Sequence, residues 1–125
     1  MNTEPVQLKD KYDYHAPDGS EIYLLVNGSK GGLCVCILPV GATSQATSHK
    51  TVEELWFFLE GHGEVYRKGI NNDEPTTVKS GTSLVIPVHC TFQFRNTGDV
   101  PLKFAITTMP PWPGPSEANS EVGIW

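Results

Sequence analysis

The sequence has little positive charge and lacks a long hydrophobic run. Nine Lys and Arg residues stand against 14 Asp and Glu residues, which gives a net charge of −5 and a pI near 5.2. Such a chain offers no basic patch to neutralise phosphates, which excludes a nucleic-acid partner. No apolar run approaches the roughly 20 residues that a membrane span requires, so we expect no contact with a membrane.

Signals for export and for disulfide bonding are also lacking. The N-terminus is polar, with acidic residues and a proline, unlike a secretory signal. There are only three cysteines, and Cys34 and Cys36 stand two apart in a strand-like run, where both would point to the same face. We therefore expect reduced, buried thiols and a cytoplasmic protein.

Helical periodicity is absent as well, whereas turn residues are frequent. The 12 Gly and 10 Pro residues separate short apolar runs at intervals typical of an all-β sandwich or barrel. A chain of 125 residues is expected to form one domain, 1–125. Strands are predicted over 21–26, 33–40, 54–59, 64–68, 75–79, 84–86, 92–95 and 102–108.

The two ends of the chain differ from this pattern. Residues 1–20 are polar and predicted to be irregular. Residues 109–125 carry four prolines and two tryptophans, Trp112 and Trp125, and proline favours extended backbone that cannot donate to a sheet. We interpret this segment as a strap that packs its tryptophans on the barrel or on a second subunit.

Two stretches carry a family resemblance, 41–61 (GATSQATSHKTVEELWFFLEG) and 81–96 (GTSLVIPVHCTFQFRN). Their spacing resembles the two motifs of the cupin superfamily, G-(x)5-H-x-H-(x)4-E-(x)6-G and G-(x)5-P-x-G-(x)2-H-(x)3-N. Seven positions match: Gly41, His49, Glu54, Gly61, Gly81, Pro87 and Asn96. The resemblance implies a cupin-type double-stranded β-helix, a jelly-roll barrel with little helix and an internal ligand site.

The departures from these motifs concern the metal site. Cupins usually hold a divalent metal with three His and one Glu, and this chain has Thr47 and Phe92 where two of those histidines would stand. Only His49 and Glu54 remain, and His89, at the motif's Gly position, is the one candidate replacement. Because a stable site normally needs three or four ligands, we expect no cofactor. Iron, nickel, manganese or zinc held by these three residues is the alternative.

The cupin resemblance implies that Glu54 points into the barrel, and strand alternation from there predicts which other side chains line it. Residues 54, 56 and 58 share one face, and residues 92, 94 and 96 share another. The expected substrate pocket is therefore largely aromatic, as small-molecule sites often are. Its predicted substrate-binding residues are Thr47, Trp56, Phe58, Phe92, Phe94 and Asn96.

His49 and Glu54 are the candidate catalytic residues. In an apolar cavity such a pair can act as general acid and base at neutral pH without a metal, as isomerases, cyclases and lyases require. A purely structural pair is the competing interpretation. Three functions remain open: acid–base enzyme, metal-dependent dioxygenase or sugar-type isomerase, and non-catalytic module that binds a small molecule.

A homodimer is expected from the resemblance, since cupins with one pair of motifs are commonly dimers. Exposed strand edges and a tail that carries tryptophan fit such an interface.

Overall fold

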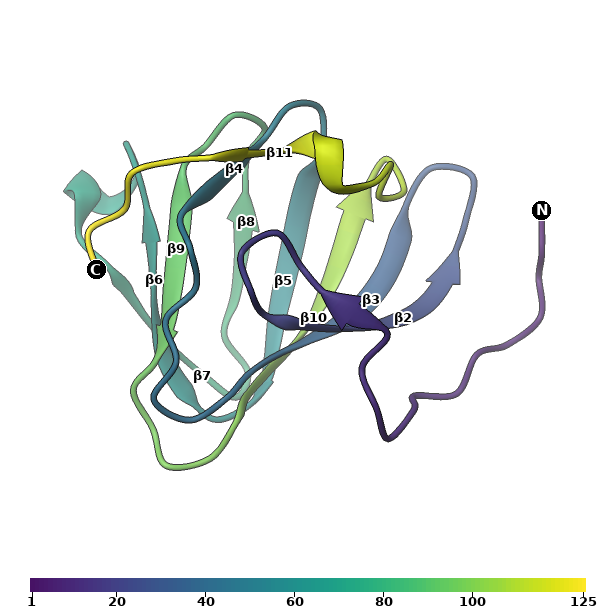
Figure 1. Cartoon of the computed structure of the whole chain (residues 1–125), viewed down its shortest axis with the longest axis horizontal. Helices are drawn as coiled ribbons and strands as arrows, with labels where there is room; N and C mark the ends of the chain where they lie inside the picture. Colours follow the sequence, from purple (N-terminus) through teal and green to yellow (C-terminus); the bar gives the residue numbers. More distant parts are fainter.

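Eleven strands form two antiparallel sheets that pack face to face (Figure 1). The computed structural model describes residues 1–125. One sheet has six strands in the order β1-β2-β3-β10-β5-β8, and the other has five in the order β11-β4-β9-β6-β7. The strands span Tyr14–His15 (β1), Glu21–Asn27 (β2), Gly32–Leu38 (β3), Thr47–His49 (β4), Glu53–Glu60 (β5), His62–Arg67 (β6), Thr76–Lys79 (β7), Ser83–Ile86 (β8), Phe92–Asn96 (β9), Leu102–Met109 (β10) and Ala118–Ser120 (β11).

This architecture confirms the predicted all-β jelly-roll barrel. The only helical segments are two short 3-10 turns, Asn71–Asp73 and Pro115–Glu117. No helix in the structure has the length and apolar character to cross a membrane. Each of the eight expected strands is present, within a few residues of its predicted ends.

Alternating burial along the central strands places the core between the sheets. On β5, the inward side chains of Glu54, Trp56 and Phe58 are buried, whereas the intervening positions are exposed. Strand β10 lies between β3 and β5, where Phe104 pairs with Cys36 on one side and with Phe58 on the other. Aromatic rings from both sheets meet there, with the ring centroids of Phe94 of β9 and Phe104 of β10 5.4 Å apart. Such pairs stabilise a core beyond the area they bury.

Three short strands are not predicted by the sequence, and all lie beside the pocket described below. Strand β1 interrupts the N-terminal segment that is expected to be irregular, and β4 and β11 are three residues each. Their sequences are short and polar, so they carry no alternating pattern. They form because neighbouring strands supply pairing partners: β1 pairs with β2, β4 with β9, and β11 with β4.

The C-terminal segment crosses the five-stranded sheet and ends beside β9 (Figure 1). The buried carboxylate of Glu117 accepts hydrogen bonds from the backbone N–H groups of Thr51 and Val52, at 2.6 and 3.1 Å. Further along, the carboxamide oxygen of Gln93 accepts bonds from the N–H groups of Ile124 and Trp125. These contacts fix both ends of 117–125 to the barrel.

Candidate functional site

A pocket opens between the two sheets at the end of the barrel that β1, β4 and the C-terminal segment cover. Its free space is about 60 Å³. Since one water needs about 10–15 Å³, the pocket has room for a few waters or a small organic fragment. Most lining side chains are apolar, and the polar or aromatic ones include Tyr14, Asp18, Ser20, Cys34, Cys36, Thr47, His49, Glu54, Trp56, Phe92, Phe94, Phe104 and Trp112.

His49 and Glu54 come together in this pocket from consecutive strands, β4 and β5. The imidazole Nδ1 lies 3.9 Å from the carboxyl Oε2, too far for a hydrogen bond. Both side chains are buried, and Nδ1 has no hydrogen-bond partner in the protein. An unpartnered buried polar atom is costly, so Nδ1 is a position where a ligand atom or a water would be stabilised.

Burial controls the protonation of both groups. It lowers the pKa of His49 from its usual 6.5 to about 4, a shift that the charge of Glu117 partly opposes. Burial also raises the pKa of Glu54 from its usual 4.5 to about 7. At neutral pH the imidazole is therefore uncharged, and Glu54 is about half protonated. The two side chains do not form an ion pair, and Glu54 is the more basic group of the two.

Trp56 fixes the orientation of the Glu54 carboxyl. Its indole Nε1 donates a 2.8 Å hydrogen bond to Oε1 of Glu54, two residues earlier on the same face of β5. This bond favours the charged carboxylate and so limits the rise in the pKa of Glu54 that burial causes. The other oxygen, Oε2, is left facing His49.

Four of the six predicted substrate-binding residues line the pocket: Thr47, Trp56, Phe92 and Phe94. Thr47 and Phe92 are direct partners in the β4–β9 pairing, so the two positions that depart from the cupin metal set lie side by side.

The placement of Phe58 and Asn96 corrects the sequence prediction. Phe58 is fully buried deeper in the core, packed on Phe104 with ring centroids 4.6 Å apart. The Asn96 side chain is occupied by structural bonds: Nδ2 donates to the carbonyls of Leu38 and Val100, and Oδ1 accepts from the N–H of Gly98. Neither residue lines the pocket. Strand alternation indicates the correct face but not how far along it the cavity extends.

The donor set does not fit the metal that the cupin resemblance implies. His89, the candidate third ligand, is exposed on a turn and does not line the pocket. Its backbone adopts a left-handed conformation with φ of 68°. No group of three His, Cys, Asp or Glu side chains is arranged to hold a metal ion. His49 and Glu54 alone supply two donors, and the hydroxyl of Thr47 and the ring of Phe92 do not replace imidazoles.

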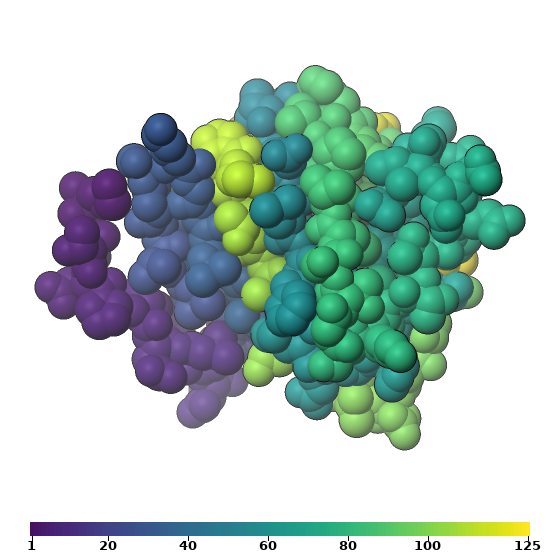
Figure 2. Space-filling view, turned by 180° about the vertical axis from the view of Figure 1, so that it is seen from behind, coloured from purple at the N-terminus to yellow at the C-terminus, as the bar shows by residue number.

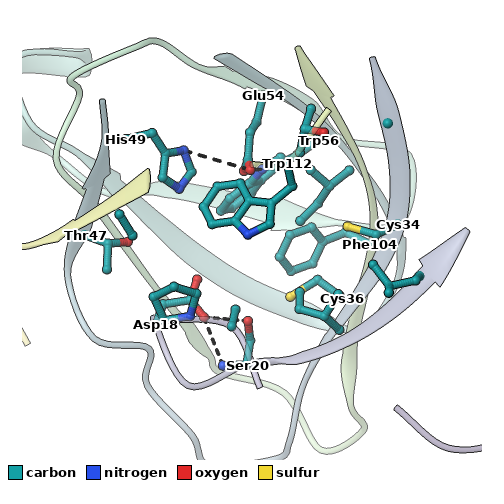
Figure 3. A pocket seen from close by; sticks show the side chains of 18 of the residues that line it. Asp18, Ser20, Cys34, Cys36, Thr47, His49, Glu54, Trp56, Phe104 and Trp112 are labelled. Atoms are coloured by element: carbon teal, nitrogen blue, oxygen red, sulfur yellow. Dashed lines mark hydrogen bonds and ion pairs between the residues drawn. The ribbon is translucent and has the colours of Figure 1, made fainter. Parts of the chain in front are cut away.

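Asp18 is a pocket residue that the sequence does not reveal. It lies in the loop between β1 and β2, on the opposite side of the pocket from His49 and Glu54 (Figure 3). Its Oδ1 accepts bonds from the backbone N–H and the hydroxyl of Ser20, at 2.9 and 2.5 Å. Burial raises the pKa of Asp18, although the bonds from Ser20 oppose the rise. The only sequence signal is the Pro-Asp-Gly turn, which is typical of ordinary surface loops.

Trp112 also reaches the pocket from a distant part of the chain. Its ring lies edge-on to His49, with centroids 5.1 Å apart, and Phe92 packs on the imidazole in a similar way at 5.2 Å. The indole thus forms part of the wall beside His49 and Glu54 (Figure 3). Trp125, in contrast, lies outside the pocket, under the guanidinium of Arg95 at 4.4 Å.

The thiols of Cys34 and Cys36 complete the wall and are free. Burial raises the pKa of Cys34 to about 12 and that of Cys36 well above its usual range. Because the thiolate is the nucleophilic form, these cysteines contribute packing to the pocket.

Comparisons with known proteins agree with this architecture. An uncharacterized protein of Methanocaldococcus jannaschii is 33% identical over 114 residues, covering 84% of this chain and 88% of the relative. Among solved structures, a variant of Streptomyces Pac13 with uridine has a TM-score of 0.75 at 10% identity, covering 97% of this chain and 92% of that one. The Schizosaccharomyces pombe Cnp3 cupin domain has a TM-score of 0.66 at 17% identity, covering 84% and 69%.

A predicted oxalate decarboxylase of Thermotoga maritima shares the fold too, with a TM-score of 0.64 at 20% identity, covering 73% of this chain and 80% of that one. At such identities the likeness shows the fold alone. The family model of the cupin domain matches residues 34–109, more than half of the chain. With both motif stretches inside that match and the double-sheet barrel in place, the chain belongs to the cupin family.

Proposed function

We propose that this cupin protein binds a small organic molecule in the pocket and transforms it by acid–base chemistry at Glu54, with His49 as its partner. One observation carries the proposal: a buried carboxyl group with a pKa of about 7 lies in a ligand-sized cavity beside an unpartnered imidazole nitrogen. A general acid or base works best when its pKa lies near the working pH, and Glu54 meets that condition without a metal.

The roles of the two groups follow from their protonation. In its carboxylate form, Glu54 takes a proton from a carbon next to a carbonyl group. The C–H electron pair forms a C=C bond, and the carbonyl π pair moves onto oxygen to give an enolate, which collapses back to the carbonyl in the next step. Return of that proton to another carbon completes an isomerisation. Its transfer to a departing hydroxyl group instead breaks the C–O bond, releases water and completes a dehydration. Neutral His49 positions the substrate through Nδ1, and Trp56 holds the carboxyl in place.

A similar fold supports such a reaction in another protein. Pac13, which shares the fold of this chain over nearly its whole length, is described as a nucleoside dehydratase. At 10% identity this likeness does not transfer a substrate. It supports the reaction class by showing that a small cupin barrel houses a dehydratase.

Proton exchange in deuterated water tests the proposal whatever the final product is. The protein is incubated with small hydroxy-carbonyl compounds, some bearing amino groups and some bearing acid groups, and deuterium incorporation and product are followed by NMR. We expect exchange or turnover with at least one compound, and a loss of about 10²–10⁴-fold in Glu54→Gln.

Glu53→Gln is the matched control, because Glu53 precedes Glu54 on β5 but points outward and is exposed. Its activity should equal that of the wild type. Unchanged activity in Glu54→Gln would refute the role of Glu54. Ligand binding without exchange for any compound would favour a non-catalytic binding module.

A further inference from the structure

The ionisable side chains of the pocket are strongly biased in sign. Two carboxyl groups line it, Asp18 and Glu54, and no Lys or Arg does. The only other group that could carry positive charge is His49, whose pKa of about 4 leaves it neutral at physiological pH. The pocket therefore offers a ligand negative charge or none.

Several polar atoms in the pocket have no protein partner to satisfy them. Asp18 uses Oδ1 for both bonds from Ser20, and no protein group donates to its Oδ2. Glu54 uses Oε1 for Trp56, and its Oε2 faces only the imidazole at 3.9 Å. With His49 Nδ1, which is buried and unbonded, these atoms line opposite sides of one cavity (Figure 3). The two carboxyl oxygens are therefore free to accept hydrogen bonds from a ligand.

The rest of the wall suits the same kind of ligand. Aromatic rings from both sheets and from the C-terminal segment surround the cavity: Trp56, Phe92, Phe94, Phe104 and Trp112. The face of an aromatic ring attracts a cation, most strongly when the cation is removed from water. An anion in the same place would meet two carboxyl groups across a medium of low dielectric constant, with no compensating cation.

We propose that the pocket selects a small organic cation, such as a compact molecule bearing an ammonium group, and rejects anions of the same size. This inference rests on the proposed site and specifies the class of its substrate. The ammonium group would donate to Oδ2 of Asp18, the negative charge of Glu54 across the cavity would add to the attraction, and the carbon skeleton would pack on the rings. Small dicarboxylates are excluded as ligands, although an oxalate decarboxylase is among the proteins of similar fold.

Cation binding is expected to strengthen with pH. The pKa of Glu54 is about 7, so this carboxyl gains negative charge as the pH increases through neutrality, while an alkylammonium ion stays protonated. The pKa of Asp18 is raised by burial as well, and this group too gains negative charge, never positive charge, as the pH increases. The other ionisable groups facing the cavity or acting on its carboxyls do not reverse this trend, because none gains positive charge as pH rises: Tyr14, Cys34, Cys36, His49 and Glu117.

The test uses three probes of nearly equal size: propylammonium, 1-propanol and propionate. Binding is followed by NMR shifts of the indole N–H signals, because Trp56 and Trp112 line the pocket while Trp125 lies outside and serves as an internal reference. At pH 7.5 we expect propylammonium to bind at least about tenfold more tightly than propionate, and its affinity to rise with pH. The signal of Trp125 should not move.

Variants distinguish the contribution of charge to ligand affinity from the contribution of packing. Asp18→Asn and Glu54→Gln should each weaken propylammonium binding by about tenfold and leave 1-propanol within about twofold. Glu53→Gln, the outward neighbour, should change neither. Thermal unfolding shows which variants are folded, and either pocket variant suffices if the other does not fold.

The binding results test cation selection, and the proton-exchange results test the acid–base role separately. Equal or tighter binding of propionate, or no shift with propylammonium near its solubility limit, would overturn cation selection. Selection of propylammonium together with no proton exchange for any compound would support the ligand class and refute the acid–base role. Loss of proton exchange in Glu54→Gln, together with a preference for propionate over propylammonium, would support the acid–base role and refute cation selection.

Discussion

Nδ1 of His49 and Oε2 of Glu54 lie 3.9 Å apart, buried and without a hydrogen bond between them. With their usual pKa values of 6.5 and 4.5, the two groups would carry opposite charges between these pH values. Here burial inverts the order of their pKa values, to about 4 for the imidazole and about 7 for the carboxyl. This inverted order lowers folding stability, and the loss has a measurable dependence on pH.

In two single variants, the free energy of unfolding should change with pH in opposite directions. In Glu54→Gln, His49 binds a proton more weakly in the folded than in the unfolded chain, so stability falls as pH drops from 6.5 to 4. In His49→Gln, Glu54 binds its proton more tightly in the folded chain, so stability is highest below 4.5 and falls as pH rises to about 7. Each change amounts to about 3 kcal/mol.

Urea unfolding at several pH values in this range measures how the free energy of unfolding of each single variant changes with pH. The double variant Glu54→Gln with His49→Gln is the reference, because it retains Asp18 and all other titrating groups. In the wild type the two trends oppose each other, and its dependence on pH should lie between those of the single variants. Slopes of the same sign in both single variants would contradict the inverted pKa order.

Trp112 should contribute to the low pKa of His49 by excluding water from one edge of the imidazole. Trp112→Ala removes a ring that lies 5.1 Å from the imidazole centroid, so hydration of His49 increases and its pKa rises from about 4 toward 6.5. An NMR titration of the imidazole Cε1–H signal measures the change. Trp125→Ala is the matched control, since Trp125 packs on Arg95 outside the pocket. Equal pKa values for His49 in the two variants would show that Trp112 does not shield it.

A second copy of this chain is the expected partner of the outer face of the six-stranded sheet. Leu55, Phe57 and Leu59 alternate along β5 and are 46, 48 and 41% exposed. Figure 2 shows the segments of β3, β10 and β5 side by side on this face. Contiguous exposed apolar side chains are typical of interaction surfaces. We expect light scattering to give about twice the 13.7 kDa of one chain.

A positive charge introduced on this face should prevent dimer formation. Phe57→Lys is expected to yield a monomer, whereas Val122→Lys, at a 90% exposed position near the C-terminus, should not change the mass. A monomeric wild type at high protein concentration would refute the dimer.

The metal content of the purified protein is expected to be well below one ion per chain. His49 and Glu54 offer two donors where a stable site needs three or four. Elemental analysis for iron, nickel, manganese and zinc, with thermal unfolding before and after chelation, measures this. Stoichiometric metal, together with a loss of stability on chelation, would show that donors other than this pair complete a site. Retention of that metal in His89→Ala would confirm that His89 is not one of them.

Sequence spacing is sufficient to predict the fold because local backbone requirements impose it. Glycine at 61, for example, has a φ of +91°, and a Cβ there would lie 2.6 Å from the carbonyl oxygen of Pro101. Such a turn tolerates only glycine, so the motif residue is visible in the sequence. Period-two burial along β5 similarly places Glu54 and Trp56 inside and Glu53 outside. The aromatic character of the pocket and its two surviving polar motif residues follow from the same pattern.

The tertiary structure alone decided what else reaches that pocket and how its groups are charged. Asp18 and Trp112 come from the two segments with no sequence periodicity. The β1–β2 hairpin places Asp18 there, and the pairing of β11 with β4 holds the segment that carries Trp112. Phe58 and Asn96 obey the predicted alternation yet lie beyond the cavity, because its length depends on how the sheets close. The pKa values of His49 and Glu54 depend on burial, which arises from the whole barrel. The sequence by itself therefore determined the barrel and the residues at its centre, and the packing of distant segments determined their chemistry.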